Sequence, residues 1–168
     1  PGNPTGAVLT SNEVESVVKL CQQHGILLIS DEIYDEFIFP PCSHASSGSF
    51  SQDVLIIRGY SKTYGCTGWR LGYAAGPTRL IDEMSKLQQQ TFVCAPSALQ
   101  RAVINAYEVD LKPMISRFSA RRDMVVDALG DVAELTIPEG AFYAFPRVPE
   151  RLGMSGSDFI AMAAKQEV

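Results

Sequence analysis

The sequence predicts an α/β fold, a three-layer sandwich with a mostly parallel central sheet, followed by part of a smaller α+β domain. Two short unbroken apolar runs, residues 26–29 and 54–57, are typical of strands that are buried on both faces. Helical patterns alternate with these runs, as they do in parallel sheets. The 168 residues are enough for one domain with a real core, or for one domain and part of a second.

The elements of the first half have local sequence signals. Thr10 and Glu13 have the spacing of a capping box, apolar residues recur at helical spacing after them, and Gly25 supplies a stop. This pattern predicts a helix that leads into the strand at 26–29. Residues 72–76 predict a further strand of small residues.

The second half predicts helices and then a change of pattern. Helices are expected after Pro77 and after Pro96. A longer helix is expected over 111–129, with Pro113 in its first turn, where proline is tolerated. Residues 135–145 then predict a β-hairpin around a Pro-Glu-Gly turn.

The end of the chain is expected to form another helix, with Ser157 or Asp158 as its cap. We place a domain boundary inside or just after the long helix, at about residue 125. Residues 1–125 are then part of a large domain, and residues 126–168 form an incomplete C-terminal small domain.

The composition argues against several classes of partner. A net charge of -5 and a pI near 5.0 disfavour nucleic acid and anionic membranes. No apolar run approaches the ~20 residues that a membrane span needs. The four cysteines are scattered, with no CxxC pair and no histidine cluster near them, which predicts free cysteines in an intracellular protein and no metal site.

Reactive side chains follow the two predicted strands. Asp31 comes directly after the first strand, and Ser61 and Lys62 lie just past the second. Because ligands bind beyond the carboxyl ends of strands in open α/β sheets, we expect an acid and an amine to converge there, with Tyr34 close by. Taken singly, these residues also fit ordinary roles, such as a helix cap or a solvated lysine.

Three segments, in order along the chain, carry a resemblance to a known family. They are Asn-Pro-Thr-Gly at 3–6, Ser-Asp-Glu-Ile-Tyr at 30–34 and Gly-Tyr-Ser-Lys-Thr-Tyr-Gly-Cys-Thr-Gly-Trp-Arg-Leu-Gly-Tyr at 59–73. With them, the chain resembles the fold-type I, class I/II aminotransferases, enzymes like aspartate aminotransferase that depend on pyridoxal 5'-phosphate (PLP). The lysine stretch is the most specific, and the resemblance covers essentially the whole chain, weakening after the long helix.

The resemblance implies a role for each matching residue. Lys62 corresponds to the lysine that holds PLP as a Schiff base and later carries the proton of the substrate's α-carbon, tasks that suit an amine whose pKa falls readily on burial. Asp31 corresponds to the carboxylate that keeps the ring nitrogen protonated. Asn3 and Tyr34 correspond to hydrogen-bond donors to the ring's phenolate oxygen, and Arg70 to the phosphate clamp.

One position departs from the family pattern. Many relatives carry a serine phosphate ligand three residues before the lysine, and here that position is Gly59. Ser61 is assigned to the cofactor instead, with a glycine N–H as the other option. The family's phosphate loop and stacking aromatic are expected before Asn3, and its carboxylate-binding arginine after Val168. We therefore expect this chain to be a fragment that does not catalyse transamination alone.

The resemblance implies transfer of an amino group between an amino acid and a 2-oxo acid through the Lys62 Schiff base. One alternative is a PLP-dependent C–S β-lyase, because scaffold and cofactor do not fix which bond breaks. Another is a PLP-sensing transcription regulator with an aminotransferase-like domain. The motifs do not name the amino acid. Residues 88–96 resemble a family stretch near the dimer interface, so a cytoplasmic homodimer without nucleic-acid or membrane partners is expected.

Overall fold

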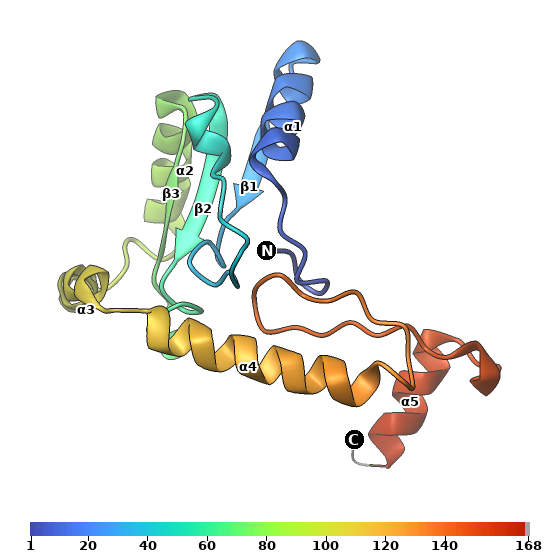
Figure 1. The fold of residues 1–168 in the computed structure, drawn as a ribbon. Coiled ribbons are helices and arrows are strands. Elements are labelled where there is room, and N and C mark those ends of the chain that lie inside the picture. Colours follow the sequence, from blue (N-terminus) through green and yellow to red (C-terminus); the bar gives the residue numbers. More distant parts are fainter. Residues whose placement is uncertain (167–168) are drawn as a thin grey trace.

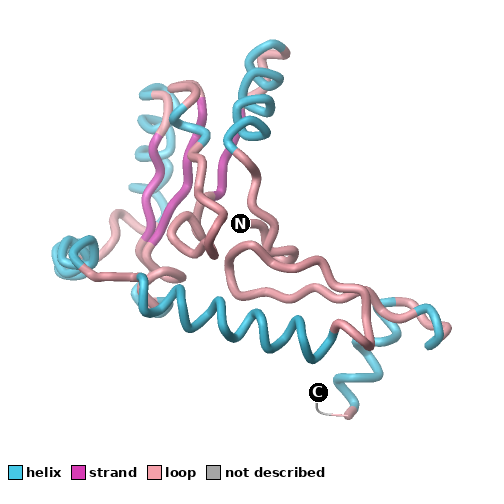
Figure 2. Tube along the Cα trace, in the orientation of Figure 1, coloured by secondary structure: helices cyan, strands magenta, loops and turns pink. Residues whose placement is uncertain are grey.

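The computed structural model describes residues 1–166, and its centre is a three-stranded sheet in the order β1-β2-β3 (Figures 1 and 2). The strands are β1 (Leu28–Asp31), β2 (Val54–Gly59) and β3 (Gly72–Ala75). The first pair is parallel, with Leu28 opposite Val54, whereas β3 runs antiparallel to β2. The α/β class is confirmed, but the sheet is mixed rather than mostly parallel. The segment between β2 and β3 contains a short 3-10 helix and no longer one, so the chain returns directly beside β2 in the opposite direction. A parallel pair would need a longer crossover, usually a helix.

Helix α1 (Ser11–Gln23) covers one face of the sheet. Its start is the predicted capping box: the Thr10 hydroxyl accepts from the Glu13 N–H, and the Glu13 carboxylate accepts from the Thr10 N–H at 2.7 Å. The buried side chains Val14 and Val18 pack against Val54 of β2. The capping box thus fixes where the helix begins and which of its residues meet the sheet.

Replacing Thr10 by alanine is expected to lower the free energy of unfolding by about 1 kcal/mol, because the Glu13 N–H in the first helical turn loses its side-chain acceptor. Denaturant unfolding measures this change. Ser16→Ala is the control: the Ser16 hydroxyl donates to the Asn12 carbonyl within α1 and caps nothing, so its loss is expected to be neutral within about 0.5 kcal/mol. Equal destabilisation by both variants would contradict the capping role.

The remaining helices follow the sheet in chain order. They are α2 (Thr78–Thr91), α3 (Ser97–Ala102), α4 (Lys112–Leu129) and α5 (Gly156–Lys165). Helix α4 runs across the carboxyl ends of β1 and β2, and the segment after it returns beside the N-terminal loop (Figure 1). Among residues 1–166, no helix is both long and apolar enough to cross a membrane.

A second core lies beneath the sheet, where residues far apart in sequence meet. Its buried members are Tyr34, Phe37, Phe39 and Ala141, and α4 adds Phe118 at its edge. Backbone hydrogen bonds tie the segment around residue 140 to the N-terminal loop and to the turn after β1. They run from Gly140 N to Gly6 O (3.0 Å) and from Ala141 N to Phe37 O (2.7 Å).

Gly6 is required by this packing. Its backbone adopts a left-handed conformation, with φ 69°, and a Cβ at this position would lie 2.6 Å from the Cβ of Pro138. Only glycine permits both the turn and the close approach. The loop that carries Asn3 is thereby held against the segment that carries residues 138–143.

The predicted hairpin at 135–145 is wrong. These residues form no strands, and their one bridge pairs Gly140 with Ile38. An isolated two-stranded hairpin is marginally stable, and the backbone here gains more by bonding to Gly6 and Phe37.

The cap predicted for the last helix is also wrong. Ser155, rather than Ser157 or Asp158, caps α5, because its side chain accepts from the Asp158 N–H at 3.2 Å. Asp158 lies in the first turn, where its charge favours the helix dipole. The predicted boundary after residue 125 falls inside α4 and stays a prediction.

Candidate functional site

Lys62 lies in the turn that follows β2, facing aromatic rings. Its Nζ atom is 6.0 Å from the centroid of the Tyr34 ring and 5.8 Å from that of Phe142. The side chain is half-buried, and among residues 1–166 it forms no ion pair. Lys62 thus presents an unpaired amine to an aromatic-walled hollow that also contains Phe118 and Phe142.

A chain of hydrogen-bonding groups runs beside this amine. The Asn3 amide donates to the Tyr143 hydroxyl at 3.3 Å, and the hydroxyls of Tyr143 and Tyr34 share a short hydrogen bond. Burial, together with the hydrogen bond to Tyr143, raises the pKa of Tyr34 well above its usual range. Tyr34 therefore keeps its proton at any physiological pH and is available as a donor.

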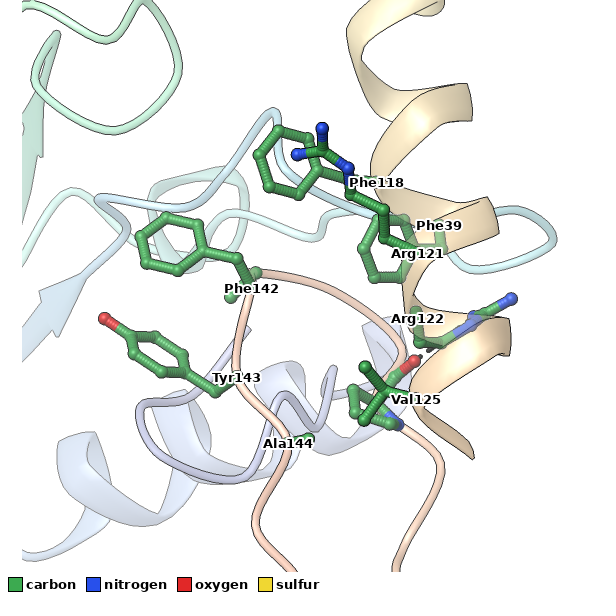
Figure 3. A pocket seen from close by; sticks show the side chains of 10 residues that line it. Phe39, Phe118, Arg121, Arg122, Val125, Phe142, Tyr143 and Ala144 are labelled. Atoms are coloured by element: carbon green, nitrogen blue, oxygen red, sulfur yellow. Dashed lines mark hydrogen bonds between the residues drawn. The ribbon is translucent and has the colours of Figure 1, made fainter. Parts of the chain in front are cut away.

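A second hollow lies behind Phe142, between α4 and residues 138–144 (Figure 3). Its volume is about 200 Å³, and its walls are mostly aromatic and aliphatic. Phe118 and Phe142 line both hollows and stand between them. In Figure 3, the Phe142 ring and the Tyr143 hydroxyl point to the same side, away from Val125.

The other predicted site residues are distributed around this centre. Asp31 is exposed at the end of β1, where its carboxylate accepts from the Ile33 N–H at 3.2 Å. It lines a neighbouring hollow with Pro1, and its charge contributes to the raised pKa of Tyr34. Ser61 is half-buried beside Lys62.

Arg70 lies on a separate loop. Its backbone is left-handed, with φ 53°, which is uncommon for a residue with a side chain. Its exposed guanidinium donates to the Thr67 carbonyl at 2.9 Å. The structure therefore brings Asn3, Tyr34 and Lys62 together, whereas among residues 1–166 the Arg70 guanidinium bonds within its own loop.

Gly59 is explained by the packing of its strand. A Cβ here would lie 2.8 Å from Ile33 Cδ1 and 3.1 Å from the Leu71 carbonyl oxygen. Both distances are shorter than normal contacts, and the carbonyl belongs to the backbone. The position where many relatives carry serine therefore has no room for a side chain in this protein.

Gly59→Ser is expected to lower the free energy of unfolding by about 1–3 kcal/mol through overpacking, without strengthening the binding of any phosphate-bearing ligand. Thermal unfolding and ligand titration measure the two effects. Gly59→Ala introduces the same clash without a hydroxyl and is expected to behave alike. Tighter ligand binding in the serine variant alone would contradict this account.

Next to Asp31, the buried Glu32 organises a polar network. Its carboxylate accepts from Arg58 Nη2 at 2.7 Å, from Ser46 Oγ at 3.0 Å and from the Ser47 N–H at 3.0 Å. It also bonds His44 Nε2 at 3.1 Å. The His44 ring is therefore held by a buried carboxylate rather than free in solvent.

The network keeps Glu32 ionised. Although burial opposes its charge, hydrogen bonds from His44, Arg58 and Ser46 lower the pKa of Glu32 to about 2. Arg58 makes a second ion pair with Asp35 at 3.1 Å, and both acids raise the arginine's pKa against the opposing effect of its burial. Glu32 and Arg58 are therefore both charged throughout the neutral range.

Sequence reasoning missed four residues of this region: Phe142, Tyr143, Glu32 and Arg58. The two aromatics come from a segment about 80 residues after Lys62, and no local pattern connects them. The sequence did contain a signal for Glu32 and Arg58, because each of these charged residues comes shortly after one of the two apolar runs. Parallel strands bring such charges to one edge.

The fold and the site together define an α/β protein with a lysine-centred, aromatic-walled site at the carboxyl ends of β1 and β2. Among residues 1–166, no cluster of side chains suited to a metal ion is present. The groups that the site does contain are an amine, phenols and a carboxylate.

Comparison with known proteins identifies the family. The model of the family "aminotransferase class I and II" matches residues 1–167. The aspartate aminotransferase of Geobacillus stearothermophilus is 36% identical over 93% of this chain and 42% of its own length. The aromatic aminotransferase of Pyrococcus horikoshii superposes with a TM-score of 0.89 and 33% identity, over 95% of this chain and 45% of that one. The aspartate aminotransferase of Thermotoga maritima gives 0.82 and 34%, over 88% and 40%.

The chain belongs to the class I and II aminotransferase family, and it spans less than half the length of these relatives. Members of the family are PLP-dependent enzymes. The residues present fit such a cofactor. Lys62 offers an unpaired amine for an aldehyde, and Tyr34 offers a protonated phenol. Thr63, 2% exposed in the same hollow, has a hydroxyl without a hydrogen-bond partner among the described residues.

Proposed function

We propose that the complete protein, meaning the natural polypeptide that contains these residues, is a PLP-dependent transaminase. It moves an amino group between an amino acid and a 2-oxo acid. The observation that carries this proposal is the position of Lys62, whose amine is unpaired within residues 1–166 and faces Tyr34. Relatives named aspartate and aromatic aminotransferases support the substrate class.

Lys62 is proposed to attach the cofactor and to move the substrate's α-proton. When bound, PLP supplies an aldehyde for the amine and a ring that stabilises negative charge at the α-carbon. A lysine suits proton transfer because its pKa falls when it lies in an apolar or cationic environment. The hollow beside Lys62 has Phe118 and Phe142 in its walls.

Asn3 and Tyr34 are proposed to stabilise an anionic oxygen of the cofactor ring. If Tyr143 accepts from Asn3 and donates to Tyr34, the Tyr34 proton remains free for an acceptor in the Lys62 hollow. Tyr143 would thus orient the Tyr34 hydroxyl as a donor. Asp31, at the end of β1, is proposed to pair with the protonated ring nitrogen.

Arg70 and Ser61 are proposed as ligands of the phosphate. A guanidinium binds phosphate through two parallel hydrogen bonds, which suits Arg70. This role requires that the side chain turn from the Thr67 carbonyl toward the site. Ser61 supports the assignment by its position beside Lys62.

The test of the reaction is an assay of the complete protein with PLP and candidate amino acids. Transamination predicts that the cofactor is converted to pyridoxamine phosphate and that a 2-oxo acid accumulates. A C–S β-lyase instead releases ammonia and pyruvate from a cysteine conjugate. Release of these two products without pyridoxamine phosphate would replace the transaminase by the lyase.

A cytoplasmic homodimer is the proposed assembly. Phe92 and Val93 support it, because both apolar side chains are 67% exposed in the segment expected to lie near a dimer interface. The four free cysteines support a reducing compartment. Sedimentation of the complete protein tests the dimer, and a monomer at micromolar concentration would contradict it.

A further inference from the structure

We propose that Glu32 and Arg58 are positioning residues that hold the turn bearing Tyr34 against the strand that leads to Lys62. The inference rests on the proposed function of Lys62. It concerns an ion pair between a buried carboxylate and a half-buried guanidinium, to which the reaction assigns no step. Neither side chain lines the Lys62 hollow, so both act through the residues they hold.

Arg58 bonds to the turn on both sides of Tyr34. Its Nε and Nη2 donate to Glu32 at 3.0 and 2.7 Å, and its Nη1 contacts Asp35 at 3.1 Å. Residues 32 and 35 flank Tyr34 in sequence. Since a planar guanidinium holds its partners in a fixed geometry, the pair constrains both ends of the turn at once.

Glu32 also connects the turn to β2 and to the loop between β1 and β2. Its other oxygen accepts from Ser46 Oγ and the Ser47 N–H, which belong to the loop between β1 and β2. Its own N–H donates to the Ile57 carbonyl at 2.8 Å. Glu32 is only 5% exposed, so these bonds form out of water, where they are strongly directional.

The Glu32–Arg58 ion pair links the segment that leads to Tyr34 with the segment that leads to Lys62. Arg58 precedes Lys62 by four residues, while Glu32 precedes Tyr34 by two. The 6.0 Å separation of Lys62 Nζ from the Tyr34 ring therefore depends on how these strand ends are joined. Displacement of a catalytic contact by about 1 Å can cost on the order of 100-fold in rate.

A purely stabilising role is a weaker explanation. Buried ion pairs are costly to desolvate, and well-packed apolar residues often stabilise a fold as well or better. What the charged network provides in addition is a single arrangement of the turn. The position of Tyr34 depends on this arrangement, because its burial and its hydrogen bond to Tyr143 both require the turn to stay in place.

The experiment compares Glu32→Gln and Arg58→Lys with Val18→Ala in the complete protein. Val18 is 1% exposed in the α1 core, away from the turn, so its truncation serves as a matched control for lost stability. Three quantities are measured: the melting temperature, the dissociation constant for PLP, and the pH midpoint of the visible absorption band of Lys62-bound cofactor. The titration of Tyr34 in the cofactor-free protein is followed by NMR of 13C-labelled tyrosine, assigned with Tyr34→Phe.

The expected result separates the variants. Glu32→Gln and Arg58→Lys weaken PLP binding about tenfold or more, shift the pH midpoint upward and bring the Tyr34 titration closer to that of a free tyrosine. Val18→Ala lowers only the melting temperature. If the two network variants behave like Val18→Ala, with unchanged Tyr34 titration and pH midpoint, the positioning role is overturned.

Failure of the proposed function gives a different result. If wild-type protein does not carry PLP on Lys62, the function is wrong whatever the variants do. The Tyr34 titration still decides the positioning role in that case, because it is measured without cofactor. A changed titration in Glu32→Gln and Arg58→Lys alone supports the role, and an unchanged one rejects it.

Discussion

Replacing Lys62 by alanine in the complete protein is expected to abolish covalent PLP attachment and to lower transamination by at least about 10²–10⁴-fold. The variant loses both the amine that binds the aldehyde and the group that moves the α-proton, and proton transfer by a positioned side chain alone contributes a factor of this size. Stopped-flow assays and the visible spectrum measure the two losses. Lys62→Arg is expected to be equally defective, because a guanidinium keeps the charge but does not attach an aldehyde.

The matched control is Lys19→Ala. Lys19 is an exposed lysine that pairs with Glu15 along one face of α1 at 2.8 Å, far from the chemistry. Its loss is expected to leave activity and spectrum unchanged. A Lys62→Ala variant with wild-type activity would show that another lysine carries the cofactor.

Phe37→Ala is expected to lower the free energy of unfolding by about 3–5 kcal/mol. Phe37 is 1% exposed and contacts Phe118 and Phe142 edge-to-face, with ring centroids 4.8 and 5.5 Å apart. Truncation leaves a cavity at the centre of the second core. Because Phe142 is one wall of the Lys62 hollow, weaker PLP binding is expected together with the loss of stability.

The control for this prediction is another phenylalanine of the same region. Phe145 is 61% exposed, so Phe145→Ala is expected to change stability by no more than about 0.5 kcal/mol. Denaturant midpoints at constant m-value compare the two variants. Similar midpoints for both would mean that Phe37 is not central to the core.

Local signals predicted the elements that they determine directly. The capping box placed the start of α1, and the apolar run at 54–57 placed β2. The strand expected at 26–29 is found two residues later, at Leu28–Asp31. The Ile26 N–H still bonds to the Cys21 carbonyl at the helix end, so the chain becomes extended only after it.

Long-range contacts account for what the sequence did not predict. The hairpin at 135–145 has a reasonable local pattern, but the contacts of Gly140 with Gly6 and Ile38 decide its conformation. The position of Tyr143 beside Asn3 likewise depends on residues 140 apart. The chain's motifs predicted roles for Lys62 and Tyr34, whereas the contact between Glu32 and Arg58 emerged only from the structure.

The most direct test of the central claim is to incubate the complete protein with PLP, reduce it with borohydride and map the modified peptides by mass spectrometry. Stoichiometric phosphopyridoxyl label is expected on the peptide that contains Lys62, with Lys19 and Lys86 unlabelled. Stoichiometric label on a different lysine, with Lys62 unmodified, would contradict this claim.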